Sequence, residues 1–234
     1  MLELARTNPD LTAFVWFLLA IMGYRLLAGF GPLERRSIVG AVQRQRERWM
    51  RNMVMRDGRI VDAHMLGTLG QGNAFFASTS ALIIGGLTAM MGSGEKIQAL
   101  LERLPYVPKS SDVLFEMKLM LLITIFIYSF FKFAWAFRLS HYAVIMIGAT
   151  PILDATNREP CELHAQQTAR LVGIAAEHSN GGLRAYYYAI AGMAWFFHPL
   201  AFVLATSWVV LILFRRDFFS RSRRLLSGPA ANPS

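Results

Sequence analysis

The sequence predicts an all-α polytopic membrane protein, a four-helix transmembrane bundle with amphipathic interfacial helices. Apolar residues make up 54% of its 234 positions and charged residues only 17%, whereas soluble proteins average about 25% charged residues. Four apolar segments are also long enough to cross a bilayer core of about 30 Å, at about 1.5 Å per helical residue. These segments lie at about 11–28, 73–91, 113–137 and 185–214 of a single membrane domain.

The first segment, 11–28, follows Asn8-Pro9-Asp10, a capping residue and a proline suited to a first helical turn. Arg25 lies near its end, where a long cationic side chain can reach the lipid headgroups. No basic region precedes the segment and no small-residue cleavage site follows it. We therefore expect a permanent helix rather than a cleaved signal peptide.

A basic loop at 33–71 follows, with eight arginines, and we expect it in the cytoplasm. Its apolar and arginine residues alternate with helical spacing, so two interpretations stay open. The helix lies in the membrane interface with its arginines on phosphates, or it is solvated and packs its apolar stripe on the rest of the protein. The candidate lipid-headgroup contacts are Arg44, Arg48, Arg51 and Trp49.

The second segment, 73–91, is rich in small residues. Helices associate in lipid through close backbone approach, which small side chains permit. We therefore expect this helix to be the most tightly surrounded of the four. The candidate helix-packing residues are Ser78, Gly85, Gly86 and Ala89.

The third segment, 113–137, contains two lysines, Lys118 and Lys132, on roughly the same face as Ser129. Two interpretations are open: the lysines reach the headgroups from positions near the segment ends, or they point inward at an acid or an anionic ligand. A helical loop, 138–184, follows. Its apolar stretch 142–147 either prolongs the third segment or dips partway into the bilayer.

Within that loop, Pro160 predicts the start of a helix, and Asn180-Gly181-Gly182 predicts its end near His178. The fourth segment, 185–214, contains Pro199, which predicts a kink. A basic tail occupies 215–234. Four crossings place both termini on one side, and the Lys and Arg count of the loops favours the outside, although the arginines of the tail disagree. A fifth crossing would return the tail to the cytoplasm.

Chemical motifs are few. The single cysteine, Cys161, excludes an internal disulfide and a cysteine-based metal cluster. His198 lies within an apolar segment, but no second histidine matches its depth for haem ligation, and it has an alternative role as partner of a carbonyl freed by Pro199. Metal-ligand, catalytic and dinucleotide-binding patterns are missing. We therefore expect no catalytic residue, metal or cofactor, and no enzyme activity.

Several strings resemble an uncharacterised bacterial membrane-protein family, domain of unknown function five-nine-nine, which also has plant relatives. The strings are WMRNMVMRDGRIVD at 49–62, NAFFASTSA at 73–81, the FFKFAWAFR core at 130–138, and LRAYYY, FFHP and FRR within 182–216. The resemblance covers nearly the whole chain and implies a multi-span membrane protein. It implies no activity and no ligand residues.

These observations predict a non-enzymatic protein of the bacterial cytoplasmic (inner) membrane, acting as a scaffold, assembly or accessory subunit. Expected partners are membrane lipid with anionic headgroups and other membrane subunits or a second copy of the chain. Nucleic acid is not expected, because the net charge of +9 comes from arginines flanking apolar segments. The alternatives are a carrier or channel for a small anionic solute and a haem-binding redox subunit. The candidate intramembrane polar site comprises Lys132, Lys118, Ser129, Arg25 and His198.

Overall fold

The computed structural model describes residues 8–29, 37–94, 97, 111–154 and 156–227, and these contain helices and no β-strands. Parts of the predicted basic loop (33–36) and tail (228–234) lie outside the described residues. Four helices are long and apolar enough to cross a membrane, which confirms the predicted fold class. The helices are α2 (Pro9–Gly29), α4 (Ile38–Val54), α5 (Ile60–Met91), α7 (Asp112–Gly148), α8 (Arg158–Met193), η1 (Ala194–Phe196), α9 (Pro199–Phe219) and α10 (Arg221–Ser227).

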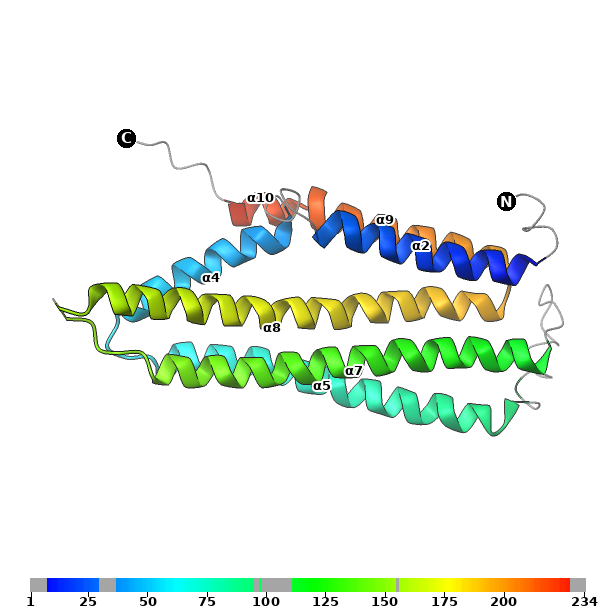
Figure 1. The fold of residues 1–234 in the computed structure, drawn as a ribbon, viewed down its shortest axis with the longest axis horizontal. Coiled ribbons are helices and arrows are strands. Elements are labelled where there is room, and N and C mark those ends of the chain that lie inside the picture. Colours follow the sequence, from blue (N-terminus) through cyan, green and yellow to red (C-terminus); the bar gives the residue numbers. More distant parts are fainter. Residues whose placement is uncertain (1–7, 30–36, 95–96, 98–110, 155, 228–234) are drawn as a thin grey trace.

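Helix length divides the molecule into two layers (Figure 1). The helices α2 and α9 have 21 residues each, about 31 Å at 1.5 Å per residue, which matches the hydrocarbon core of a bilayer. The helices α5, α7 and α8 have 32, 37 and 36 residues and extend well beyond that thickness. We call the part beside α2 and α9 the apolar layer. The projecting part, which packs with α4, is the basal bundle.

Stacked aromatic rings form the core of the apolar layer. Trp195, just after α8, stacks on Phe202 of α9 with ring centroids 5.0 Å apart. Phe17 of α2 lies 4.9 Å from the same Phe202 ring. The indole N–H of Trp195 also donates to Asp10 at the start of α2, at 2.8 Å. The end of α8 therefore lies level with the start of α2.

The basal bundle has its own apolar core, built from α4, the first part of α5, the last part of α7 and the first part of α8. Met50 and Met53 on α4 are fully buried in it. Trp49 packs against the same core and donates from its indole N–H to the buried Asp62 carboxylate, at 2.6 Å. The amphipathic helix thus packs its apolar stripe on the protein, as the second interpretation requires, and Trp49 faces Asp62 instead of headgroups.

The predicted fourth segment, 185–214, is not one span. It contains the end of α8, a 3-10 turn and the start of α9, which runs back beside α2 (Figure 1). The reversal lies at Pro199, which lacks an N–H and forces the preceding residue to be extended. His198 accordingly has φ −162° and ψ 141°. Pro199 therefore separates two helices where the sequence predicted a kink.

This reversal changes the topology. The last part of α8 lies beside α2 and α9, so the chain passes through the apolar layer five times, in α2, α5, α7, α8 and α9. The helix α8 as a whole is too polar to count among the four apolar spans. The start of α2 and helix α10 lie at opposite ends of the α2–α9 pair (Figure 1). This arrangement predicts opposite sides of the membrane for these two parts of the chain, against the expectation of both termini on one side.

The structure overturns one predicted helix end and decides between the two interpretations of 142–147. The helix α8 continues through Asn180-Gly181-Gly182. A Cβ on Gly182 would lie 2.6 Å from the Phe133 ring of α7, so only glycine lets the two helices approach this closely. Glycine serves close packing here and does not end the helix. The helix α7 continues through 142–147, so that stretch prolongs the third segment and does not dip into a bilayer.

The small residues that the sequence predicts as the packing face of α5 do not pack within this chain. Only 6% of the apolar window of α5 is buried, so the expectation that this helix is the most tightly surrounded is wrong. Its packing face instead carries Ala77 and Ser80, which are buried. The four predicted packing residues, Ser78, Gly85, Gly86 and Ala89, are exposed.

Candidate functional site

A cavity of about 520 Å³ lies between α2, α7 and α8 and reaches the start of α4 and the end of α9. One part lies among apolar side chains of the apolar layer, and the other part carries polar and charged side chains at the border with the basal bundle. The apolar lining includes Phe17, Leu18, Ile21, Leu121 and Ile125. The polar lining includes Arg25, Lys132, Glu177, His178, Asn180, Arg184 and Asp217.

Lys132 provides a positive charge that forms no ion pair among the described residues. Its Nζ lies 3.5 Å from Nδ1 of His178 and 5.5 Å from the centre of the Tyr128 ring. Among the described residues, no carboxylate oxygen lies within 4.0 Å of that Nζ. The pKa of His178 is lowered by burial and, to a smaller extent, by the Lys132 charge. His178 is therefore neutral at pH 7, and the cavity can attract an anion.

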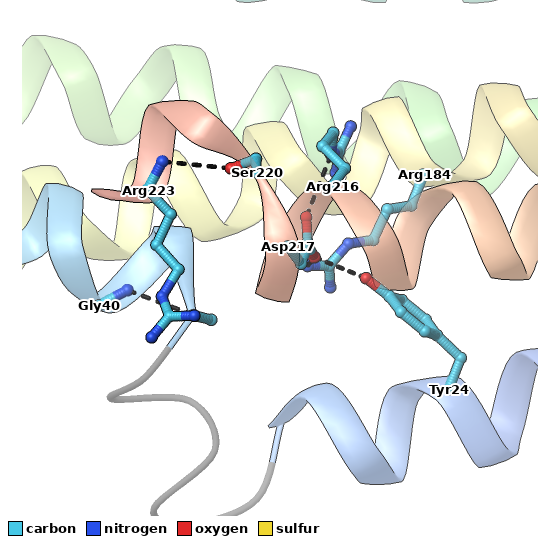
Figure 2. Close-up of polar contacts among 8 residues, drawn as sticks. Tyr24, Gly40, Arg184, Arg216, Asp217, Ser220 and Arg223 are labelled. Carbon is cyan, nitrogen blue, oxygen red and sulfur yellow. Dashed lines mark hydrogen bonds and ion pairs between the residues drawn. The ribbon is translucent and has the colours of Figure 1, made fainter. Parts of the chain in front are cut away.

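Asp217 joins three helices at the edge of this cavity (Figure 2). Its carboxylate is buried and accepts hydrogen bonds from the Tyr24 hydroxyl of α2 at 2.6 Å and from Arg184 of α8 at 2.9 Å. The neighbouring Arg216 donates to the other carboxylate oxygen at 3.1 Å. Two guanidinium groups thus share one carboxylate, which leaves this cluster with a net positive charge.

Two further hollows continue the cavity under α4. A hollow of about 230 Å³ shares Asn180, Arg184 and Asp217 with the cavity. A third, of about 620 Å³ between α4 and α8, shares Glu177 with the cavity and Arg46 with the second hollow. The three spaces therefore adjoin one another along α8, and together we call them the cleft. Its cationic lining residues are Arg25, Arg44, Arg46, Lys132, Arg170, Arg184 and Arg216, against the acids Glu47, Glu177 and Asp217.

The structure separates the predicted polar residues. Arg25 and Lys132 line the same cavity. Lys118 lies at the opposite end of the apolar layer, buried 3.7 Å from the Asp10 carboxylate and over the Trp195 ring. It therefore points inward at an acid and does not reach for headgroups. Ser129 is fully buried and donates to the carbonyl of Gly182 at 3.2 Å, so it joins α7 to α8 and does not line the cavity.

His198 has a capping role. Its Nδ1 accepts a hydrogen bond from the N–H of Leu200 at 3.0 Å, and its side chain caps α9. The predicted bond to a freed carbonyl is replaced by this cap. Arg44, Arg48 and Arg51 are exposed on α4. Of these three, Arg44 borders the 620 Å³ hollow.

The described residues contain no group of three His, Cys, Asp or Glu side chains that could hold a metal ion. A model of the family described as "Protein of unknown function, DUF599" matches residues 12–222. The chain belongs to DUF599. This confirms the resemblance carried by the sequence strings. No curated protein and no solved structure matches the chain.

Every residue that lines the cleft falls inside the DUF599 match. Sequence reasoning missed Tyr24, Arg184 and Asp217 of this DUF599 chain. One signal was available for Asp217, a single acid between two arginines and an aromatic pair at the end of an apolar segment. Its partners lie 33 and 193 positions away, so spacing could not identify them.

Proposed function

We propose that this protein is a non-enzymatic multi-pass protein of the bacterial cytoplasmic membrane that binds an anionic lipid in the cavity between α2, α7 and α8. One observation carries the proposal. The cavity joins apolar walls among the spanning helices to cationic side chains at the border of the apolar layer. A lipid has the same division, an apolar tail next to a charged headgroup.

The arginine distribution supports the cytoplasmic side for the basal bundle. The arginine-rich α4 and the basic helix α10 lie side by side, beyond the same end of α2 and α9 (Figure 1). Positively charged segments are retained in the cytoplasm and attract anionic lipid. In this orientation, the charged part of the cavity lies at the depth of the cytoplasmic headgroups.

Lateral access supports a lipid over a soluble solute. The helix α2 packs chiefly on α9, while the cavity separates part of α2 from α7. Leu18, which lines the cavity from α2, is 48% exposed. A lipid tail can therefore lie between α2 and α7 with its headgroup next to Arg25 and Lys132. The alternative function, an anion carrier, was predicted to use Lys132, Lys118, Arg25 and Ser129. Arg25 and Lys132 line this cavity, whereas Ser129 and Lys118 do not.

Titration of phosphatidylglycerol into neutral-lipid nanodiscs that carry the purified protein tests the proposal. We expect saturable binding, weakened about tenfold or more in Lys132→Ala because a charge-assisted contact is lost. Lys132→Arg keeps the charge and retains most of the affinity. Arg138→Ala, which removes a cation of the same helix outside the cavity lining, is the matched control. Equal affinity of wild type and Lys132→Ala would refute the proposal.

A second candidate function is that of an accessory subunit. The outward position of Ser78, Gly85, Gly86 and Ala89 supports it, because small residues on a lipid-facing helix allow close approach of another helix. Cross-linking in native membranes through a cysteine at position 86, compared with one at 75, tests this role. A specific adduct from position 86 supports a partner helix, whereas monomeric protein in both cases counts against it.

A further inference from the structure

Three arginines from three helices surround the hollow of about 230 Å³ that adjoins the cavity. They are Arg46 of α4, Arg184 of α8 and Arg216 of α9. Asp217 is the one acid in the lining of this hollow. The hollow has room for more than one water molecule, each of which occupies about 30 Å³ in the liquid.

Arg46 is the least compensated of the three. Its side chain is half-buried, and its hydrogen bond to Oε1 of Gln43 is long, at 3.4 Å. Among the described residues, no carboxylate oxygen lies within 4.0 Å of its guanidinium group. Burial lowers the pKa of Arg46. A desolvated cation without a counter-charge is costly, so the site favours an incoming anion.

Asp217 does not provide that counter-charge. Its carboxylate already accepts hydrogen bonds from Tyr24, Arg184 and Arg216. The Nε of Arg184 is buried without a hydrogen-bond partner in the described residues. Arg184 and Arg216 also lie over the Tyr24 and Tyr187 rings, 5.3 Å and 5.8 Å from the ring centres. These rings carry no formal charge, so the hollow retains excess positive charge.

We propose that Arg46, together with Arg184 and Arg216, binds the phosphate group of the lipid headgroup. This inference rests on the proposed function, since the lipid tail occupies the adjoining cavity. The hollow and the cavity share Val39, Asn180 and Arg184, so one molecule can occupy both. Phosphate is the ligand class because guanidinium groups match its oxygens in two-pronged pairs, and three of them can contact separate oxygens.

Arg46→Gln tests the proposal, with Arg48→Gln as the matched control. Both variants remove one positive charge from α4, but Arg48 is exposed and lines none of the three spaces. In neutral-lipid nanodiscs titrated with phosphatidylglycerol, we expect Arg46→Gln to bind about tenfold or more weakly. Arg48→Gln should stay within about twofold of wild type, because a single exposed charge contributes little.

Thermal unfolding without anionic lipid separates ligand binding from a structural role. Arg46→Gln should melt no lower than wild type, because the substitution removes an uncompensated charge. The rise in melting temperature that phosphatidylglycerol gives to the wild type should be lost. A lower melting temperature of Arg46→Gln in neutral lipid would identify a structural partner for Arg46 and overturn the inference.

The remaining outcomes distinguish this inference from the proposed function. Unchanged lipid affinity in Arg46→Gln, with weaker binding in Lys132→Ala, would overturn the phosphate site alone. Unchanged affinity in both variants would overturn the site and the proposed function together.

Competition between inorganic phosphate and phosphatidylglycerol identifies the source of the phosphate group. Competition that disappears in Arg46→Gln supports a site that also accepts free phosphate. If inorganic phosphate does not compete, and Arg46→Gln still binds phosphatidylglycerol more weakly than wild type, the site is restricted to the lipid.

Discussion

The Tyr24 hydroxyl and the Asp217 carboxylate form a 2.6 Å hydrogen bond between helices 193 positions apart in the chain. The same carboxylate accepts from Arg184 and Arg216 (Figure 2). This cluster joins α2, α8 and α9 at the edge of the cavity. It therefore holds the cavity wall in position and keeps two guanidinium groups beside the proposed ligand.

Asp217→Asn should destabilise the protein by about 3 kcal/mol, because loss of the buried carboxylate charge leaves the half-buried Arg184 and Arg216 uncompensated. Thermal unfolding in detergent measures the effect. Tyr24→Phe is the control, since it removes one hydrogen bond and should cost about 1 kcal/mol. If Asp217→Asn and wild type unfold at the same temperature, the cluster does not hold the three helices together.

Gly182→Ala should destabilise the contact between α7 and α8 by about 1–3 kcal/mol, the usual cost of overpacking. The added Cβ would lie 2.6 Å from the Phe133 ring, which is fully buried and has little room to move. Unfolding in detergent measures the loss. Gly86→Ala is the matched control, because a Cβ there meets no atom within 4 Å. Equal stability of both variants would contradict the close packing of α8 on α7.

Acidification should tighten anion binding and weaken the ligand-free fold through His178. Its pKa is lowered by burial and by Lys132 from the ordinary value of 6.5, so the unfolded chain takes up this proton at a higher pH than the native protein. Stability from His178 is thus complete above about pH 6.5 and is lost as pH falls through the lowered pKa. A protonated His178 then adds charge beside Arg25, Lys132 and Arg184, opposed by Glu177.

His178→Gln checks this pH dependence, because it keeps a polar side chain that does not titrate. Phosphatidylglycerol affinity is measured in nanodiscs from pH 7.5 to pH 5.5 for wild type and variant. We expect the acid-induced gain in affinity to disappear in His178→Gln. An identical gain in the variant would assign the titration to another group.

Five passages through the apolar layer predict that residue 8 and residue 223 face opposite sides of the membrane. Reactive cysteines introduced at these two positions and labelled in intact cells measure the topology. The native Cys161 is fully buried and should stay unlabelled. We expect labelling at position 8 from the outside and at position 223 only after permeabilisation. Labelling of both positions from one side would restore a four-pass topology.

Apolar run length was enough to predict the fold class, because a bilayer sets the length of a spanning helix. It could not predict that 185–214 reverses direction, since residues on both sides of Pro199 are apolar. It also misassigned Asn180-Gly181-Gly182, because glycine serves both helix ends and close packing. Only the Phe133 ring against Gly182 distinguishes the two uses.

The candidate site was half predictable. Lys132 and Arg25 stand out as cations in apolar segments, and both line the cavity. Lys118 stands out equally but pairs with Asp10 at the other end of the apolar layer. Arg46 looks like any other arginine of the basic loop, and only its half-buried position on α4 without an ion pair among the described residues sets it apart. The local sequence shows which residues are charged. Whether a charged residue has an ion-pair partner depends on residues that are distant in the sequence.

Native mass spectrometry of protein released directly from bacterial membranes tests the central claim, that the cationic cleft holds an anionic lipid. We predict one anionic phospholipid bound to the wild type and its loss in the double variant Lys132→Ala/Arg46→Gln, with Arg138→Ala/Arg48→Gln retaining it. Wild-type protein released without lipid, or equal lipid retention by both double variants, would contradict the account.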